Sequence, residues 1–532
     1  MMSIVDSGSA PASSLRARRL VSDLHPSDGD LVFFVLLLFI LPNAILAAVF
    51  GWPVAALVWG GCAGAVVVAW RARRATPFSA QPAALGRLAA CLAFGLALCA
   101  LGGEGHFFYA SRDWLVRDAV LADLVRAGAN ALYREGGADY MLRAPLGAYL
   151  VPSLVGRIAG LLAAHVALLL QNATIIGVTC YFVTKIAGEF GRCRNAALLL
   201  VFIGFAGLDI LPLLIAEAIE WMRGAPVMPF PHMEWWGRYF SALHMQYTSH
   251  VALLFWAINH SAPGWWFALL ALLHARGAAP FAILPVAFAA MLLWSPLAMM
   301  GAAPVLAYLA MERFPRHLSR RENLVAIGSS LAFLPIALYL TIDNGAVEKE
   351  WLVLRDGFFT RYVLHMMFEI PQAAIVLYAW RMVEPCERRL VALALILLAI
   401  IPLYSIGLYN DFMMRASIAP LFLLSVVFAR IAVLTPRDNG RFASAISTIV
   451  LISAATPLIE LKTAVMGGRF DVSDCDLLTS WRKNEPTAPF GNYLAHAEAV
   501  PSWLMRPQNG EPKTREDRKC WPDHPLLPED EK

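Results

Sequence analysis

The stretch from Gly103 to Arg143 reads GEGHFFYASRDWLVRDAVLADLVRAGANALYREGGADYMLR, and it follows roughly seventy residues of nearly unbroken apolar sequence. It combines acids, arginines, aromatic residues and a helical pattern in about forty residues. A connection that only turns the chain around needs about four to six residues. The length and polarity of this stretch therefore predict a surface with its own task, part of an active site at one face of a membrane.

The composition of the chain predicts a polytopic membrane protein. Of its 532 residues, 59% are hydrophobic and 15% are charged. A water-soluble globule of this composition would expose apolar patches far above the usual few hundred Å². The net charge of +4 is small and spread over many turns, so nucleic acid binding is not expected. The eight cysteines include no CxxC pair, and neither a metal site nor a redox motif follows from them.

Apolar runs of about twenty residues predict the membrane spans, and clusters of Lys and Arg predict the cytoplasmic turns. Arginines in the first twenty residues place the N-terminus inside, and RARR at 71–74 marks the next inner turn. A helix over LGAYLVPSLVGR is expected to lie near the outer surface, before the fourth span. The fold class is thus all-α, with about thirteen transmembrane helices at about 31–50, 53–70, 84–102, 161–184, 196–216, 251–277 with a break at 259–264, 278–294, 297–311, 324–341, 364–383, 390–407, 417–434 and 443–461.

This topology divides the chain into three parts and exposes four polar loops outside. The parts are a cytoplasmic N-terminal tail (1–30), a transmembrane domain (31–462) and an extracytoplasmic C-terminal tail (463–532) whose last dozen residues look disordered. Cys475 and Cys520 both lie in the tail, where they either form a disulfide or stay as free thiols. The outer loops, including amphipathic helices in the first, are 103–145, 217–249, 343–362 and 409–416.

In the first outer loop, SRDWLVRDAVLADLVR suits a helix that Ser111 could cap. Asp113 and Arg117 are four residues apart and share a face, while Asp118 points elsewhere. Ordinary solvated charges on a surface helix are one interpretation. Acids at a membrane boundary are costly unless they face a cavity, which favours a function. Asp113, nearest the end of a span, is the first candidate for catalysis, and Asp118 is the second.

The fourth outer loop, in IGLYNDFMMRASIAPLFLL, interrupts one of the most apolar parts of the chain. Asp411 and Arg415 are spaced to pair on one helix face, as a structural salt bridge or as part of an outer cavity. A planar guanidinium suits a phosphate better than an ammonium does. Arg415, Arg361 and Arg143 are therefore candidates for binding an anionic donor, although arginines at span boundaries also snorkel without a function.

The second outer loop and the start of the next span are rich in aromatic and polar residues, in PHMEWWGRYFSALHMQYTSH and FWAINHSAPGWW. Trp and Tyr are expected at the membrane interface, and they also suit the apolar faces of sugar rings. Their histidines match no HExxH or comparable ligand set, so no metal is predicted. The histidines weighed as ligands are His232, His244, His250 and His260, and the candidates for substrate binding are Glu234, Arg238, His260 and Asp411.

These features together resemble the glycosyltransferase C superfamily of integral membrane enzymes, which use polyprenyl-phosphate-linked sugars. The resemblance rests on RDWLVRDAVLADL, LRAPLGAYLVPSLVG, FWAINHSAPGWW and YNDFMMRASIAPLFLL, which are also similar to bacterial membrane proteins of that type. It covers about residues 85–435. The superfamily's acid is often one of a pair, whereas Asp113 stands between Arg112 and Trp114. By this similarity Asp113 takes the role of the base, and Arg415 or Arg361 that of the donor phosphate's partner.

The resemblance implies inverting transfer of a sugar from a polyprenyl-phosphate donor to a glycan, lipid or protein acceptor at the outer face. Neither a cofactor nor a metal is expected. A composition rich in Ala and Arg and poor in Lys favours a bacterial inner membrane, whose lipids surround the chain. Two alternatives stay open: a transporter or flippase for a lipid or solute, in which the same charges are gates, and an assembly subunit without a site.

Overall fold

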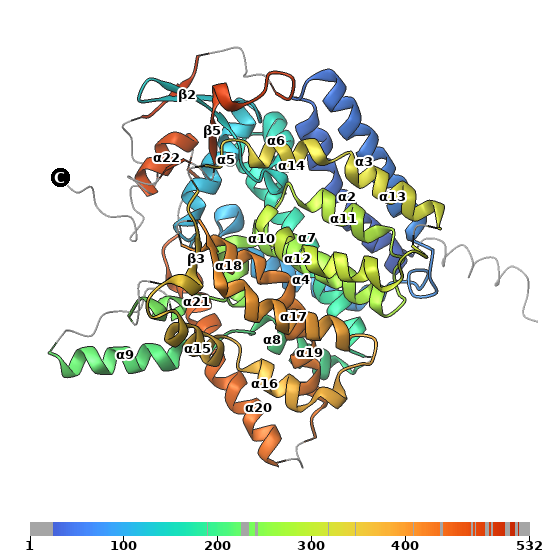
Figure 1. The fold of residues 1–532 in the computed structure, drawn as a ribbon, viewed down its shortest axis with the longest axis vertical. Helices are drawn as coiled ribbons and strands as arrows, with labels where there is room; N and C mark the ends of the chain where they lie inside the picture. The colour runs from blue at the N-terminus through green and yellow to red at the C-terminus, as the bar shows by residue number, and fades with distance from the viewer. Residues whose placement is uncertain are drawn as a thin grey trace, which may run out of the picture.

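The computed structural model describes residues 25–188, 190–224, 233–239, 243–317, 319–345, 347–407, 409–436, 440–469, 472–473, 475–484, 489–490, 493–505, 511–516 and 520, apart from the side chains of residues 238 and 239. The chain is mostly helical (Figure 1). In this described part, five helical segments are long and apolar enough to cross a membrane, namely Asp28–Ala47, Trp52–Ala72, Leu161–Ala187, Arg321–Thr341 and Gly440–Met466. Helical membrane architecture is thus supported, while thirteen spans remain a prediction.

The helices of the first half are, in chain order, α2 (Asp28–Ala47), α3 (Trp52–Ala72), α4 (Leu85–Leu101), η1 (Glu104–His106), α5 (Asp113–Arg126), α6 (Gly147–Ala159), α7 (Leu161–Ala187), α8 (Arg192–Ile203), α9 (Ile210–Met222), η2 (Met233–Tyr239) and α10 (His250–Ala275). Three of these helices, α4, α6 and α7, pack on the helices of the first outer loop.

The helices of the second half complete the bundle. They are α11 (Ile283–Met291), α12 (Pro296–Glu312), α13 (Arg321–Leu331), α14 (Leu334–Thr341), η3 (Leu352–Leu354), α15 (Phe358–Glu369), α16 (Gln372–Tyr378), η4 (Trp380–Met382), α17 (Arg388–Ile400), η5 (Ile401–Leu403), α18 (Asp411–Ala416), α19 (Ile418–Leu434), α20 (Gly440–Ser453), α21 (Ala455–Met466), α22 (Leu477–Asn484) and η6 (Ala497–Ala499).

Several predicted spans are broken in the structure. The span expected at 196–216 is divided by a non-helical segment between α8 and α9, and α9 projects from the body of the molecule at the lower left of Figure 1. The region 364–383 is likewise divided between α15 and α16. The break expected at 259–264 was wrong, because α10 is helical there despite Pro263 and departs from helical geometry at Ala257 instead. Irregular backbone inside a bundle needs partners from protein, which these sites have.

The first outer loop contains a small sheet that joins it to the C-terminal tail. The strands β1 (Leu132–Glu135) and β2 (Ala138–Leu142) form an antiparallel hairpin, β5 (Leu494–His496) adds antiparallel to β2, and β6 (Lys513–Thr514) adds parallel to β1. A disulfide joins Cys475 to Cys520. In a second sheet, β3 (Lys349–Trp351) pairs with β4 (Tyr404–Ile406). The tail residues described here are therefore a folded part of the molecule, packed on the first loop near β2, β5 and α22 in Figure 1.

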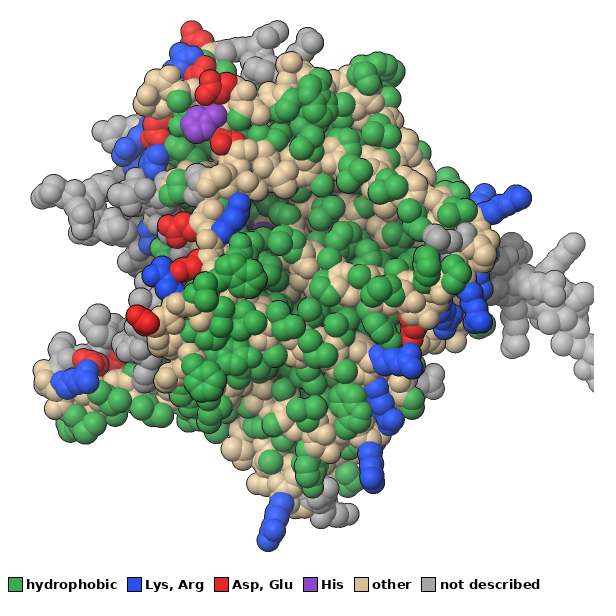
Figure 2. Space-filling model, in the orientation of Figure 1, with side chains coloured by type: hydrophobic (Ala, Val, Ile, Leu, Met, Phe, Trp, Pro, Cys, Tyr) green, Lys and Arg blue, Asp and Glu red, His purple; other side chains and the backbone are tan. Residues whose placement is uncertain are grey.

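The ion pairs join turns that the sequence predicts to lie on the same side. At the end expected to be cytoplasmic, Lys185 pairs with Asp28, and Glu387 with both Arg276 and Arg430. In Figure 2, Lys and Arg side chains follow the right and lower-right edge, acids and further Lys and Arg side chains gather at the left, and hydrophobic side chains cover the region between. An apolar band between two charged ends is compatible with a membrane protein.

Candidate functional site

Helix α5 presents the first candidate acid at its N-terminus. The cap predicted at Ser111 was wrong: Arg112 is the N-cap residue, and no side chain caps the helix. Half of the Asp113 side chain is exposed, and its Oδ2 lies 3.6 Å from Nη2 of Arg117, whose side chain is 8% exposed. The Arg117 guanidinium lies 5.2 Å from the centre of the Trp114 ring, and its buried Nη1 has no hydrogen-bond partner. An accessible carboxylate thus stands beside a guanidinium with unused donor capacity.

The fourth outer loop holds its charged pair rigidly. Asp411 Oδ1 and Arg415 Nη2 are 2.9 Å apart, so the predicted pairing along α18 is present. Asn410 caps α18 with its side chain, adopts a left-handed backbone (φ 57°), and donates from its amide to the carbonyl of His244. Asn tolerates this backbone region better than most residues do. The cap fixes the start of the helix at Asp411, and Arg415 follows four residues later in its last turn.

Tyr493 of the C-terminal tail connects these two loops. Burial raises the pKa of its hydroxyl; Arg415 and Arg117 lower this pKa by their charge, while Asp113 and Asp411 raise it further. All four charges therefore act on one phenol, although they come from segments about three hundred residues apart. His260 is also subject to the charge of Arg415 and Arg117. We name this set the acid–arginine cluster: Asp113, Arg117, His260, Asp411, Arg415 and Tyr493.

Two members of the cluster were not among the sequence candidates. Arg117 had a signal in the sequence, its spacing of four from Asp113, but it was noted only as a neighbour on the same face. Tyr493 had none, because its position depends on the pairing of β5 with β2. Arg143, predicted to bind a phosphate, lies behind Tyr493: its backbone N–H donates to the Tyr493 carbonyl over 2.7 Å, and its guanidinium donates to the carbonyl of Asp343 over 3.5 Å.

Arg361 and Glu234 belong to a second, buried group of charges. Arg361 is 2% exposed, stacks 3.9 Å from the Trp236 ring centre, and donates to the carbonyl of Met245 over 2.8 Å. A Cβ at Gly237 would come within 1.8 Å of its Nη2, so only glycine leaves room for the guanidinium there. The environment of Arg361 is therefore enclosed, unlike that of Arg415. Arg238 lies in η2, but its side chain is outside the described part of the structure.

Glu234 lies in the same buried group. Its carboxylate accepts from the backbone N–H of Ser249 over 2.8 Å and from the Gln246 amide over 2.6 Å. Burial, reinforced by the negative charge of Asp209, raises the pKa of Glu234 to about 8. Glu369 on α15 interacts electrostatically with both Glu234 and Arg361, and Glu234 is a buried acid rather than a ligand on a surface.

Asp118, the second candidate for catalysis, is fully buried on α5. Its Oδ1 accepts from Nε2 of His106 over 3.0 Å and lies 3.9 Å from Nδ1 of His165. The ligand atoms of these three residues all lie within 4.8 Å of one another, a set that could hold a metal ion. The histidines weighed as ligands from the sequence are not part of this group. His250 instead bonds the carbonyl of Phe202.

Of the other three histidines weighed as metal ligands, the two that the structure describes lie apart from this set. His260 bonds Ser295 through Nδ1 over 2.8 Å and lies within the acid–arginine cluster. The ring of His244 packs edge-on against Tyr409. His232 lies outside the described residues. The metal-capable histidines are therefore two that the sequence analysis did not consider, His106 and His165.

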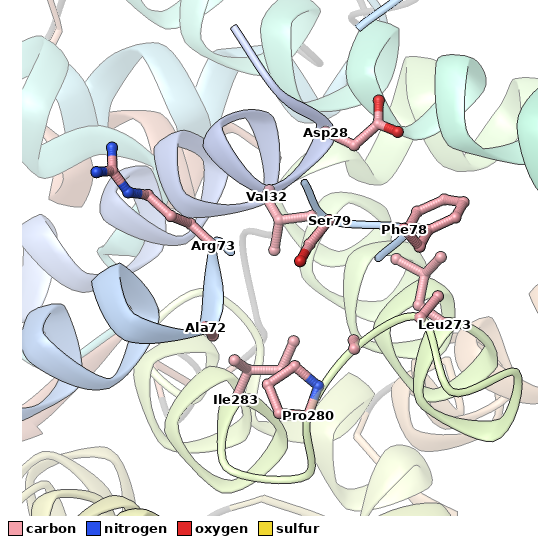
Figure 3. A pocket seen from close by; sticks show the side chains of 12 residues that line it. Asp28, Val32, Ala72, Arg73, Phe78, Ser79, Leu273, Pro280 and Ile283 are labelled. Carbon is pink, nitrogen blue, oxygen red and sulfur yellow. The ribbon is translucent and has the colours of Figure 1, made fainter. Parts of the chain in front are cut away.

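A small cavity lies at the opposite end of the bundle from the acid–arginine cluster. It has about 20 Å³ of room between the start of α2, the end of α3 and the connection from α10 to α11. Figure 3 shows Val32, Ser79, Pro280 and Ile283 around this space, with the charged end of Arg73 directed away from it. A cavity of this size holds about one water molecule, which excludes a sugar or a lipid chain.

Compared with protein-family models, curated proteins and solved structures, the chain shows no significant match.

Proposed function

We propose that this protein transfers a sugar, with inversion, from a polyprenyl-phosphate donor to a glycan, lipid or protein acceptor. The reaction would take place at the membrane face that carries the acid–arginine cluster. We place it in a bacterial inner membrane, with the N-terminus cytoplasmic and the C-terminus periplasmic. The observation that carries the proposal is a half-exposed carboxylate, Asp113, 3.6 Å from Arg117, together with a second acid–arginine pair, Asp411 and Arg415, and the charges of both pairs act on Tyr493.

Asp113 suits the part of the general base. Its side chain is half exposed, so an acceptor hydroxyl can approach it from outside. In the proposed step Asp113 takes the proton of that hydroxyl while the oxygen forms a bond to the anomeric carbon, and the bond from that carbon to the phosphate oxygen breaks. A positioned base of this kind contributes about 10²–10⁴-fold to a rate. Asp118, fully buried beside two histidines, lacks this access.

The arginines suit the leaving group. Negative charge develops on the polyprenyl phosphate as its bond to the sugar breaks, and preorganised donors stabilise that charge most when water is excluded. Arg117 has a buried donor nitrogen without a partner, and Arg415 is held by Asp411 and is 28% exposed. A guanidinium can donate two parallel hydrogen bonds to a phosphate. We therefore assign phosphate binding to Arg415, which is 28% exposed. Arg117, buried beside Asp113, contributes its positive charge, and Arg361, which is enclosed, has no direct part.

Transfer by the purified protein in lipid nanodiscs tests the proposal. A panel of radiolabelled polyprenyl-phosphate sugars is offered with a membrane extract as the acceptor. We expect the wild type to label a product and Asp113→Asn to transfer sugar about 10²–10⁴-fold more slowly. Arg415→Lys keeps the charge but loses the planar fork, so it should weaken donor use while the protein stays folded.

Asp139→Asn is the matched control. Asp139 is an exposed acid on β2 whose partner is Arg134, at 2.6 Å, and surface pairs of this kind contribute little to stability. Its substitution should leave the transfer rate within about twofold of the wild type. Full activity of Asp113→Asn would show that Asp113 is not the general base. Movement of labelled lipid across the bilayer without donor cleavage would replace the transferase with a transporter.

A further inference from the structure

We infer that His106, Asp118 and His165 form a binding site for a divalent transition-metal ion, with zinc as the expected occupant. The three residues come from η1, α5 and α7, so the site would join the first outer loop to a membrane helix. The inference does not depend on the proposed transferase activity. It goes against the sequence analysis, which predicted no metal from the spacing of other histidines.

The geometry of the three side chains suits one ion. The His106 and His165 rings are nearly perpendicular, with centres 5.0 Å apart, and both lie close to the Asp118 carboxylate. All three side chains are almost completely buried. A tetrahedral zinc ion with bonds of about 2.0–2.1 Å places its ligand atoms about 3.4 Å apart. The observed separations, within 4.8 Å, reach that value by small rotations of side chains.

The state of His165 is the second observation that points to a ligand. Its ring is fully buried, its Nδ1 lies 3.9 Å from Oδ1 of Asp118, and neither ring nitrogen has a hydrogen-bond partner in the described part of the chain. A buried polar group without a partner costs roughly 1–3 kcal/mol, so native proteins rarely leave one. His250, equally buried, has one ring nitrogen bonded, 2.7 Å from the carbonyl of Phe202. His365 also has both ring nitrogens unbonded among the described residues, but it lies beside one acid, Glu369 at 4.0 Å, and not in a set of three ligands. A metal ion would supply the partner that His165 lacks.

The chemistry of the set selects the class of ion. Two imidazoles and one carboxylate suit zinc and other first-row divalent cations, whereas calcium and magnesium prefer sites made of oxygen ligands. The other Asp118 oxygen faces the backbone N–H of Ser473 at 3.4 Å, a contact that can orient the carboxylate. Three protein ligands leave at least one coordination position for water or a polar group.

A simple hydrogen-bonded triad is the alternative, and it explains less. The bond from His106 to Asp118 satisfies one histidine and neutralises part of the buried carboxylate's cost. In this alternative, neither ring nitrogen of His165 has a hydrogen-bond partner among the described residues.

Metal content of the intact protein tests the site. The chain is purified in detergent without a histidine tag, supplied with zinc, washed with a weak chelator, and measured by elemental analysis. We expect about one zinc per chain for the wild type and for the control His250→Gln. His165→Gln and Asp118→Asn should each lose at least about nine-tenths of that zinc. Wild-type content below about one-tenth, or full content in both variants, would overturn the inference.

Cobalt substitution covers the case in which the variants do not fold. Cobalt(II) bound by two imidazoles and a carboxylate gives ligand-field absorption bands that differ from those of the hydrated ion. The wild type should show these bands at one equivalent, and added zinc should remove them. A spectrum that stays that of the hydrated ion would reject the site without any variant. Neither measurement uses transferase activity, so a failure here is distinct from a failure of the proposed function.

Discussion

Glu234 shows how burial sets the behaviour of a single acid in this protein. It lies in η2, is 7% exposed, and has the acids Asp209 and Glu369 nearby. From the sequence, where it is one charge among tryptophans, we predicted a substrate-binding residue. The packing of η2 instead encloses it, and no charge pattern along the chain indicates that enclosure.

The raised pKa of Glu234 predicts a pH-dependent stability. The pKa of this acid is about 8 in the folded protein, against 4.5 as its ordinary value, so the folded state holds the proton more tightly. The stabilisation is complete below about pH 4.5 and is lost as the pH rises toward about 8. The unfolding temperature of the wild type should fall between pH 5 and 9, and Glu234→Gln should make this fall smaller. The difference corresponds to a few kcal/mol of unfolding free energy at most.

Glu220→Gln is the control variant for this pH dependence. Glu220 is an exposed acid of α9 that pairs with Arg223, also exposed, and its loss should leave the pH profile unchanged. Differential scanning fluorimetry in detergent over this pH range measures both variants beside the wild type. A Glu234→Gln profile parallel to that of the wild type would mean that the acid is ionised in the fold.

Asp113 and Asp118 show how far sequence alone could separate two acids. Their spacing of five predicted that they point to different sides of one helix, and they do. Asp113 is half exposed while Asp118 is fully buried. The sequence predicted a helix with one apolar side, but α5 is buried on nearly all sides because α6 and α22 both pack on it. The covering residues of α22 come from the tail, beyond any local pattern.

At the scale of elements, the packing of α4 against α7 depends on two glycines. A Cβ at Gly95 would come within 2.7 Å of the Ala173 carbonyl oxygen and of the Gly177 nitrogen, and a Cβ at Gly177 within 2.7 Å of Leu92. Small residues allow helix backbones to approach closely in membranes, where packing rather than hydrophobicity holds them together. This contact fixes the helix that carries His165.

Gly95→Ala should therefore separate the two helices and destabilise the protein. Overpacking of this kind costs about 1–3 kcal/mol, which lowers the unfolding temperature. Gly86→Ala on the same helix is the matched control, since nothing lies within 4 Å of a Cβ there. It should be neutral or slightly stabilising, because alanine favours helix more than glycine does. Equal unfolding temperatures for the two variants, measured in the same detergent, would exclude the close contact.

At the scale of the whole molecule, the arrangement of basic turns predicts which cysteines are accessible from each side. Cys193 and Cys386 are the exposed free thiols, and both lie in turns predicted to be cytoplasmic. The other six cysteines are buried or form the disulfide. A thiol reagent that cannot cross membranes should therefore label Cys193 and Cys386 only after the cells are opened.

Asp356→Cys introduces a cysteine on the side predicted to be outside, for the same labelling experiment. Residue 356 is exposed in the loop between η3 and α15, which the sequence places outside. A cysteine there should be labelled in intact cells, with Cys193→Ser and Cys386→Ser in the background. Labelling of Cys193 from outside would invert the proposed orientation and move the acid–arginine cluster to the cytoplasm.

Patterns along the sequence are enough to predict the class and the local elements of this protein. Apolar runs and basic turns predicted helical membrane architecture, the helix over α5, the surface helix α6 followed by the long helix α7, and the pairing of Asp411 with Arg415. These follow from patterns within about twenty residues, where the period of the helix and the position of charge carry the information.

Contacts between distant segments come from the three-dimensional packing. This packing joins the tail to the first loop through β5 and β6, places Tyr493 under the charges of Asp113 and Arg415, and buries both Arg361 and Glu234. It also set His106 and His165 on either side of Asp118. The physical reason is that such contacts depend on the relative placement of whole helices, which is fixed by close packing and by satisfying buried polar groups across the molecule.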